Sequence, residues 1–388
     1  MATFKLACTS AHAKKIAEKI ALPKNRLSST ITVGKMKGML ILILVLTGTL
    51  FCLHLAMFES KIDYFHKPTI WNKFRADKRI SLTMNPDSVL NFSPNFETKS
   101  TSYRENTRNL TVITAYWNLG TFQKGLTGAH FSTNTYFSWA FTFKYLLNQL
   151  VVYTDMKEFK ELIENLRVDL INSTKIFLLN RTDVWPFQLK ERMKVIYSQP
   201  GYPKYYPNTV NPGYTAAQHA KYAVVANTVR KGIFRAPYYA WLDVGYFRDI
   251  AKRKVFFELH TPEGFDPDRL AVNRINDLSM NVDPFNIFRN NDVWVGGGMF
   301  LGSGKVILEF EKLYHKAVLY FLEQKIMNSD QQVLYALYSK KGREALKPNL
   351  ELQLYIPKGS GNPWFYLGYL CVNDVLKERK IERQIGEE

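Results

Sequence analysis

Residues 110–117 read LTVITAYW, a run of β-branched and aromatic residues that is typical of a buried strand. Apolar residues at helical spacing follow at 132–149, and the strand-like run LVVYTD follows at 150–155. The alternation then continues with a helix at 157–167, a strand at 175–180, helices at 187–198 and 214–231, strands at 238–245 and 292–302, and helices at 304–326 and 328–340. This pattern predicts an α/β fold with a mainly parallel, doubly wound sheet.

The N-terminal part of the chain has a different character. Residues 38–58 (GMLILILVLTGTLFCLHLAMF) carry no formal charge, and as a helix their 21 residues span about 30 Å, the thickness of a bilayer core. Cleaved signal peptides have shorter apolar cores closer to the N-terminus, so this segment is predicted to be an uncleaved transmembrane signal anchor. Residues 1–37 hold eight Lys and Arg against one Glu, which predicts a cytoplasmic tail and a lumenal C-terminal part.

Residues 59–108 are polar and rich in turn formers, so they are predicted to be a stem below a lumenal domain at 109–388. Cys371 is the single cysteine beyond the anchor; it is predicted to be buried, and no disulfide can form within that part of the chain. The topology predicts a type II membrane protein of the Golgi or ER. Four sequons that follow the anchor are predicted glycosylation sites: Asn91, Asn109, Asn172 and Asn180.

The chain carries a net charge of +18, of which the tail accounts for +7. A basic domain favours anionic partners. No nucleic-acid-binding motif is present, and a lumenal domain is out of reach of most nucleic acids, so an anionic donor or an acidic glycan fits better; the alternative is a basic surface without a specific partner. The sequence also lacks the G-x-S-x-G, H-E-x-x-H, P-loop and G-x-G-x-x-G motifs, which excludes the commonest hydrolase, NTPase and dinucleotide-binding classes.

Ligands of open parallel sheets bind beyond the carboxyl ends of the strands, so residues at those ends are candidates for a site. Asp243 ends a buried strand and is predicted to hold Mn²⁺ or Mg²⁺ against a diphosphate; the alternative is a cap of the following turn. The backbone amides of Gly296, Gly297 and Gly298 could approach a ligand closely, or the three could form a bend. Asp330 begins a helix, where it either favours the helix dipole or accepts a proton from an acceptor hydroxyl.

Three stretches together resemble the GT-A class of nucleotide-sugar glycosyltransferases: LTVITAYW, YYAWLDVG, and DVWVGGGMFLGSG followed about thirty residues later by NSDQQVL. More narrowly, they resemble the HtrL/YibB-like (WlaTC/HtrL) family over roughly residues 108–375. GT-A enzymes usually hold Mn²⁺ or Mg²⁺ with an Asp-x-Asp at the end of the mid-domain strand. The resemblance makes Asp243 the first acid, but Gly245 stands in place of the second, and Asp249 is a nearby alternative ligand. The likeness of the D-Q segment suggests that Asp330 lies near the acceptor.

The resemblance implies transfer of a sugar from a nucleotide-sugar donor to a glycan or protein acceptor in the secretory pathway, with Asp243 and Asp330 as catalytic residues. Lys221 or Arg248 could offset the charge of the diphosphate. The candidate donor-binding residues are Thr114, Tyr116, Trp117, Asp155, Lys221, Trp241 and Gly245. The candidate acceptor-binding residues are Gly296, Gly297, Gly298 and Gln331. The alternative, favoured by Gly245, is a non-catalytic lumenal binding protein with a degenerate glycosyltransferase fold.

Overall fold

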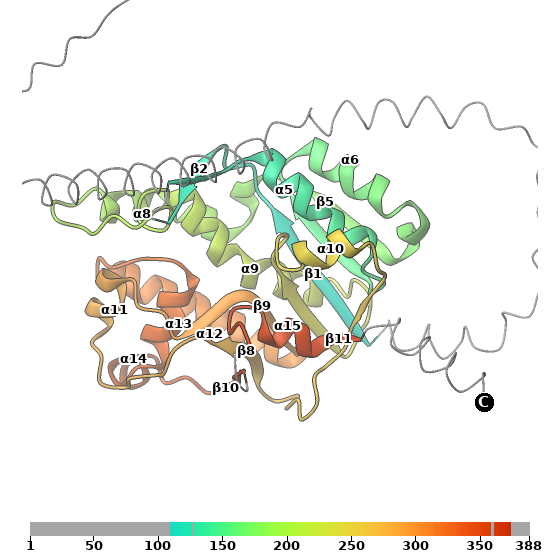
Figure 1. The fold of residues 1–388 in the computed structure, drawn as a ribbon. Helices are drawn as coiled ribbons and strands as arrows, with labels where there is room; N and C mark the ends of the chain where they lie inside the picture. The colour runs from blue at the N-terminus through green and yellow to red at the C-terminus, as the bar shows by residue number, and fades with distance from the viewer. Residues whose placement is uncertain (1–108, 126–127, 358–360, 374–388) are drawn as a thin grey trace, which may run out of the picture. The chain divides into compact units, whose positions relative to one another are not determined.

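The computed structural model describes residues 109–125, 128–357 and 361–373 (Figure 1). The predicted tail, anchor and stem therefore lie outside the described residues, as does the sequon at Asn91. Among the residues that are described, no helix has both the length and the apolar character needed to cross a membrane.

A seven-stranded sheet forms the centre of the fold, in the order β10–β8–β9–β6–β1–β4–β5. Strands β6, β1, β4 and β5 run parallel to one another, and β8 pairs in parallel with β10. The prediction of an α/β fold with a mainly parallel sheet is therefore confirmed. The strands are β1 (Leu110–Tyr116), β4 (Leu150–Thr154), β5 (Thr174–Leu178), β6 (Tyr238–Leu242), β8 (Leu270–Arg274), β9 (Val295–Ser303) and β10 (Leu352–Tyr355).

Strand β9 runs in the opposite direction to its neighbours. It pairs antiparallel with both β6 and β8, so that Leu242 at the end of β6 lies opposite Met299, the residue that follows the three glycines of β9. The glycines at the start of β9 therefore lie at the edge where the parallel strands end. The sequence indicated this strand but not its direction, and the direction is what brings Gly297 and Gly298 to the carboxyl edge of the sheet.

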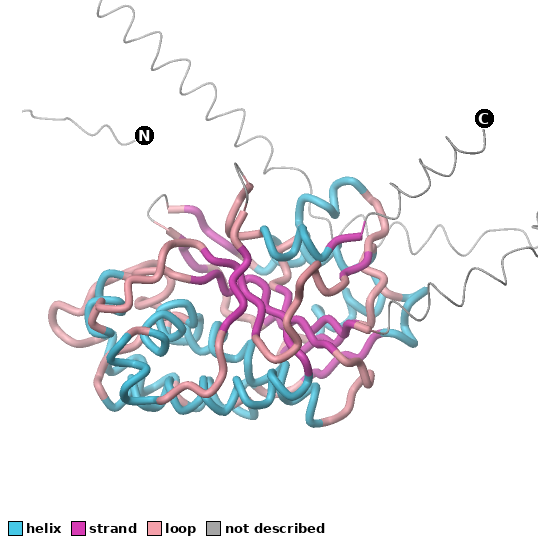
Figure 2. Tube along the Cα trace, turned by 90° about the horizontal axis from the view of Figure 1, so that it is seen from below, coloured by secondary structure: helices cyan, strands magenta, loops and turns pink. Residues whose placement is uncertain are grey.

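Helices lie on both sides of the sheet (Figure 2). Two successive residues show this, because Tyr116 packs against Phe159 on one face, whereas Trp117 packs against Phe187 on the other. The face of Tyr116 is covered by α5 (Thr133–Ala140), η1 (Phe141–Lys144), α6 (Lys157–Leu166), α10 (Arg248–Arg253) and α15 (Tyr366–Cys371). The face of Trp117 is covered by α7 (Trp185–Gln188), α8 (Lys190–Tyr197), α9 (Pro212–Arg230), α12 (Gly304–Glu323) and α13 (Asp330–Tyr338).

Helix α9 is buried on nearly all sides. Small side chains such as Ala216, Ala220 and Ala223 let it lie directly against β1 and β6, with α12 on its other side. Asn211 caps its N-terminus by accepting a hydrogen bond from the amide of Tyr214 at 3.1 Å. This packing places Lys221, in the middle of the helix, beneath the carboxyl edge of the sheet.

The structure contains several helices and strands that the sequence did not indicate. Strands β8 and β10, helix α11 (Pro284–Asn290), helix α14 (Lys340–Leu346) and the hairpin of β2 (Phe122–Lys124) and β3 (Ala129–Phe131) were not predicted. The short strands β7 (Glu258–Leu259) and β11 (Val372–Asn373) form a separate pair. The helix predicted at 132–149 ends earlier, because α5 passes into a 3₁₀ turn at Phe141. Cys371 is buried, as predicted.

Candidate functional site

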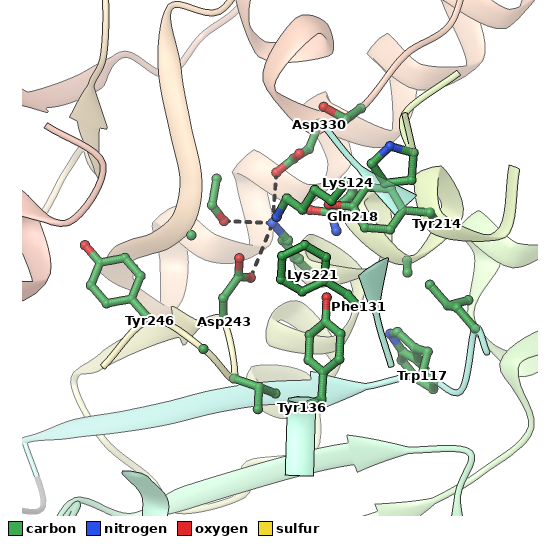
Figure 3. Close-up of a pocket in the computed structure, with 18 of the residues that line it drawn as sticks. Trp117, Lys124, Phe131, Tyr136, Tyr214, Gln218, Lys221, Asp243, Tyr246 and Asp330 are labelled. Carbon is green, nitrogen blue, oxygen red and sulfur yellow. Dashed lines mark hydrogen bonds and ion pairs between the residues drawn. The ribbon is translucent and has the colours of Figure 1, made fainter. Parts of the chain in front are cut away.

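A cleft of about 810 Å³ opens at the carboxyl edge of the parallel strands. Its floor is formed where the end of β6, the start of β9, the middle of α9 and the start of α13 meet (Figure 3). Much of its wall is aromatic. The aromatic rings that line it include Phe131, Tyr136, Trp139, Tyr214, Trp364 and Phe365.

Lys221 is the cation at the floor of this cleft, and its side chain is only 3% exposed. Its Nζ donates a hydrogen bond to the carbonyl oxygen of Gly297 at 2.8 Å and lies 3.3 Å from Oδ2 of Asp330. Oδ1 of Asp243 lies 3.4 Å from the same Nζ (Figure 3). One ammonium thus joins two carboxylates and a strand carbonyl that are far apart in the sequence.

The two carboxylates differ in exposure. The side chain of Asp330 is 2% exposed, whereas that of Asp243 is 42% exposed and faces the cleft. Oδ1 of Asp243 also accepts a hydrogen bond from the indole of Trp241 at 2.7 Å. Asp243 is therefore the carboxylate that a bound molecule can reach, while Asp330 lies behind it and holds the lysine.

Burial and charge act in opposite directions on the titration of this cluster. Burial alone would lower the pKa of Lys221, but the carboxylates of Asp243 and Asp330 outweigh it and the pKa is raised. Burial raises the pKa of Asp330 above its ordinary value, although Lys221 opposes the change. The lysine therefore keeps its charge at neutral pH.

The glycines of β9 are required by the side chains around them. A Cβ on Gly297 would lie 2.2 Å from Oδ2 of Asp330, and one on Gly298 would lie 3.1 Å from the ring of Tyr246. Here β9 presents carbonyl groups, because Gly297 O accepts from Lys221 and Gly298 O accepts from the amide of Asp243 at 2.9 Å. The amides considered from the sequence are not the groups that make these contacts.

A family model described as "Bacterial protein of unknown function (HtrL_YibB)" matches residues 108–344. The chain belongs to the HtrL/YibB family. This confirms the narrower of the two resemblances seen in the sequence. Among curated proteins, Protein HtrL of Escherichia coli (strain K12) is 26% identical over 272 residues, which covers 66% of this chain and 90% of HtrL.

A solved structure, the apo form of mouse xyloside xylosyltransferase 1, is 12% identical to the chain with a TM-score of 0.32. The match covers 64% of this chain and 85% of the mouse protein. The description of the HtrL/YibB family assigns no function, so the function of this member has to be argued from its own site.

The structure of this HtrL/YibB chain brings most of the predicted site residues to the cleft. Those that line it are Tyr116, Trp117, Lys221, Trp241, Asp243, Gly245, Gly297, Gly298, Asp330 and Gln331. Three others lie elsewhere. Thr114 is fully buried within β1, and the Cα of Gly296 faces Ile275. Asp155 accepts a hydrogen bond from the amide of Asn118 at 2.8 Å and pairs with Arg181 at 2.8 Å, so it shapes the loop after β1.

The acids considered as ligands of Mn²⁺ or Mg²⁺ are already paired with lysines. No three His, Cys, Asp or Glu side chains gather as a metal site in the part of the chain that is described. Asp243 and Asp330 already share the ammonium of Lys221. Asp249, the alternative ligand considered from the sequence, pairs with Lys252 at 2.9 Å on the exposed side of α10.

The sequence did not reveal how the mouth of the cleft is built. The guanidinium of Arg248 lies 5.5 Å from the ring centre of Trp139 and 5.3 Å from that of Phe365. Its Nη1 donates to the carbonyl of Gly245 at 2.9 Å. Tyr246 anchors the far wall, because its hydroxyl accepts from the amide of Gly368 at 3.2 Å. Trp139 and Phe365 are too far apart in the sequence for any local pattern to pair them.

Proposed function

We propose that the chain is a glycosyltransferase that binds a nucleoside-diphosphate sugar in the cleft. The observation that carries the proposal is the ammonium of Lys221, held between Asp243 and Asp330 at the floor of an aromatic cleft. A fixed positive charge stabilises the negative charge that develops on a departing diphosphate. Aromatic walls suit the stacking of a nucleobase and of sugar rings, and the volume is in the range of small-molecule sites.

The two carboxylates take different roles in this proposal. Asp243 is exposed to the cleft, so it is the group that contacts the substrates and accepts a proton from the acceptor hydroxyl or a hydrogen bond from the donor sugar. The sequence assigned the proton to Asp330, and that assignment remains a prediction. Because Asp330 is buried, we propose it as a positioning residue that fixes the ammonium of Lys221.

Donor binding tests the proposal directly. The purified full-length chain is titrated with UDP-, GDP- and CMP-sugars, and binding is followed by calorimetry and by the shift in Tm. We expect a UDP- or GDP-sugar to bind, Asp243→Asn to weaken this binding, and Asp249→Asn, a matched exposed carboxylate, to bind like the wild type. Binding of CMP-sugars alone, or of no nucleotide sugar, would contradict the proposal.

A second function is favoured by the position of Gly245. A side chain there would meet Trp139, so the acid that usually completes the Asp-x-Asp pair has no room. A protein that binds the donor without transferring the sugar fits this feature. Release of nucleoside diphosphate in the presence of a panel of glycan acceptors separates the two functions, because the binding protein would release none.

The membrane topology is also a proposal. We propose a type II protein of the Golgi or ER whose C-terminal domain is lumenal, with residues 38–58 as the anchor. Three predicted glycosylation sites, Asn109, Asn172 and Asn180, are exposed, as glycan attachment requires. Expression in a secretory host followed by N-glycosidase treatment tests this: the mobility shift should appear in the wild type and disappear when all four sequon asparagines are replaced by Gln.

A further inference from the structure

The ammonium of Lys221 has surroundings that a hard metal cation would also have. Three oxygen atoms surround its Nζ: the carbonyl of Gly297 at 2.8 Å, Oδ2 of Asp330 at 3.3 Å and Oδ1 of Asp243 at 3.4 Å. Carboxylate and carbonyl oxygens are the groups that Mg²⁺ and Mn²⁺ prefer. We propose that Lys221 occupies the place of a divalent cation between these carboxylates, so that the donor is bound without a metal ion. The part of this inference that concerns the donor rests on the function proposed above.

The place of a second metal-binding acid is filled by an indole ring. An ideal Cβ on Gly245 would lie 2.4 Å from Cε3 of Trp139 and 2.9 Å from Cζ3. The ring is itself held in place by Tyr136, at 5.2 Å between ring centres, and by the guanidinium of Arg248. An Asp at position 245 would therefore require the ring of Trp139 to move away from its two neighbours. The space that the side chain of a second acid would fill is occupied by the ring of Trp139. This packing is expected of a site that binds its ligand without a metal ion.

The charged side chains that line the cleft can bind a diphosphate without the help of a metal ion. The charged lining residues are Lys124, Lys221, Arg248, Asp243 and Asp330, three cations and two anions, which gives +1. Lys221 compensates the carboxylates at the floor. Arg248 and Lys124 stand nearer solvent, each beside an aromatic ring, with Lys124 5.8 Å from the ring centre of Phe131. These two residues can contact the phosphates from the solvent side of the cleft, and Lys221 faces the departing diphosphate from the floor.

The wild-type chain provides the first test. Mn²⁺ binding to the purified full-length chain is followed by the electron paramagnetic resonance signal of free Mn²⁺, and donor binding is measured by calorimetry with excess EDTA or with excess Mn²⁺. We expect no Mn²⁺ bound at the cleft and the same donor Kd in both conditions. Donor binding that requires Mn²⁺, or Mn²⁺ binding that Asp243→Asn removes, would overturn the inference.

Removal of the lysine provides the second test. In Lys221→Ala the two carboxylates and the carbonyl of Gly297 lose their cation, so we expect the variant to gain a Mn²⁺ site that the wild type lacks. Lys231→Ala, at the exposed C-terminal end of the same helix, is the matched control and should bind no Mn²⁺. A folded Lys221→Ala chain, judged by circular dichroism, that binds no Mn²⁺ would count against the inference. If the variant does not fold, the wild-type measurement decides.

The two proposals fail in different ways. If no nucleotide sugar binds, the proposed function fails, yet the Mn²⁺ measurements on the wild type and on Lys221→Ala still report on the lysine. If a donor binds and transfer depends on Mn²⁺, the proposed function stands and the built-in cation is refuted.

Discussion

Two buried cations, Arg167 and Lys221, lie at opposite edges of the sheet and have partners of different kinds. Arg167 is 1% exposed and donates hydrogen bonds to the carbonyls of Phe143 and Asn148, at 3.1 and 2.9 Å, and to that of Leu146. Its Nε donates to the hydroxyl of Thr174 at 2.8 Å. All of these partners are neutral, whereas Lys221 has two carboxylates.

The difference in partners explains the difference in titration. Burial lowers the pKa of Arg167 to about 10, because no carboxylate compensates its charge. Burial acts on Lys221 in the same direction, yet its carboxylates raise its pKa. Arg167 joins the segment before β4 to the start of β5, so its role is structural. Lys221 gathers charged groups beside a cleft, and in the proposed function its role is chemical. Burial alone does not separate the two roles, but the charge of the partners does.

The largest effect is expected from Lys221→Met. Loss of the fixed cation should lower sugar transfer about 10³-fold, because the charge of the departing diphosphate is no longer stabilised. Two carboxylates are left without their partner, so the free energy of unfolding should also fall, by about 3–5 kcal/mol. Transfer assays and urea unfolding measure both quantities, with Lys231→Met as the control. A folded variant with wild-type transfer would show that Lys221 is structural, as Arg167 is.

Arg167→Met should damage stability and leave the chemistry unchanged. Each of the three buried carbonyls left without a donor costs about 1 kcal/mol or more, so the free energy of unfolding should fall by about 3 kcal/mol. Transfer per folded molecule should equal that of the wild type. Urea unfolding checks the first point, and Arg192→Met, which removes an exposed ion pair to Glu323, should change stability by less than about 1 kcal/mol. Loss of transfer in folded Arg167→Met would contradict the division of roles.

Gly297→Ala tests whether the position of Asp330 matters to the chemistry. The added Cβ would displace the carboxylate that holds Lys221, and a displacement of about 1 Å near the reacting groups can lower a rate about 10²-fold. Gly304→Ala is the control, because a Cβ there meets its nearest atoms at 3.4 Å, an ordinary contact. Gly297→Ala should therefore transfer sugar more slowly than Gly304→Ala. Equal transfer rates would mean that the site tolerates the displacement of Asp330.

The smallest effect expected is a dependence of stability on pH. Burial raises the pKa of Asp330 in the folded chain above its value in the unfolded chain, so the folded chain holds that proton more tightly. The stability linked to this group is present at low pH and is lost as the pH rises through the folded-state pKa. The free energy of unfolding, measured by urea unfolding at a series of pH values, should therefore fall more with rising pH for the wild type than for Asp330→Asn, by about 1.4 kcal/mol for each unit of pKa difference. The opposite trend would show that Lys221 dominates the titration of Asp330.

The sequence predicted the layers of the fold well, because the period of the apolar residues distinguishes strands from helices. It also indicated Asp243, Asp330 and Lys221, which the structure brings together, although it placed no contact between the lysine and the acids. The direction of β9 was not predictable in this way. A strand has the same side-chain period whichever way it runs, and β8 is too short and too close to loops to be recognised.

Of the two acids predicted from strand ends, Asp243 lines the cleft and Asp155 does not. Both follow buried strands of the same sheet, but Asp155 is paired with Arg181, and Asp243 is open to the cleft. The difference depends on Arg181, which lies on a later segment. Similarly, Trp139, Arg248 and Phe365 meet only in the folded chain. Such contacts between distant segments are not encoded in any local pattern.

The floor of the cleft also has a consequence for the order of folding. The hydrogen bonds of Lys221 join residues that are 76 and 109 positions apart, so we expect them to form late, after the sheet has closed around β9. Contacts that form after the transition state affect the rate of unfolding more than the rate of folding. A nucleotide bound at this floor is therefore expected to lengthen the lifetime of the folded chain while leaving its refolding rate nearly unchanged.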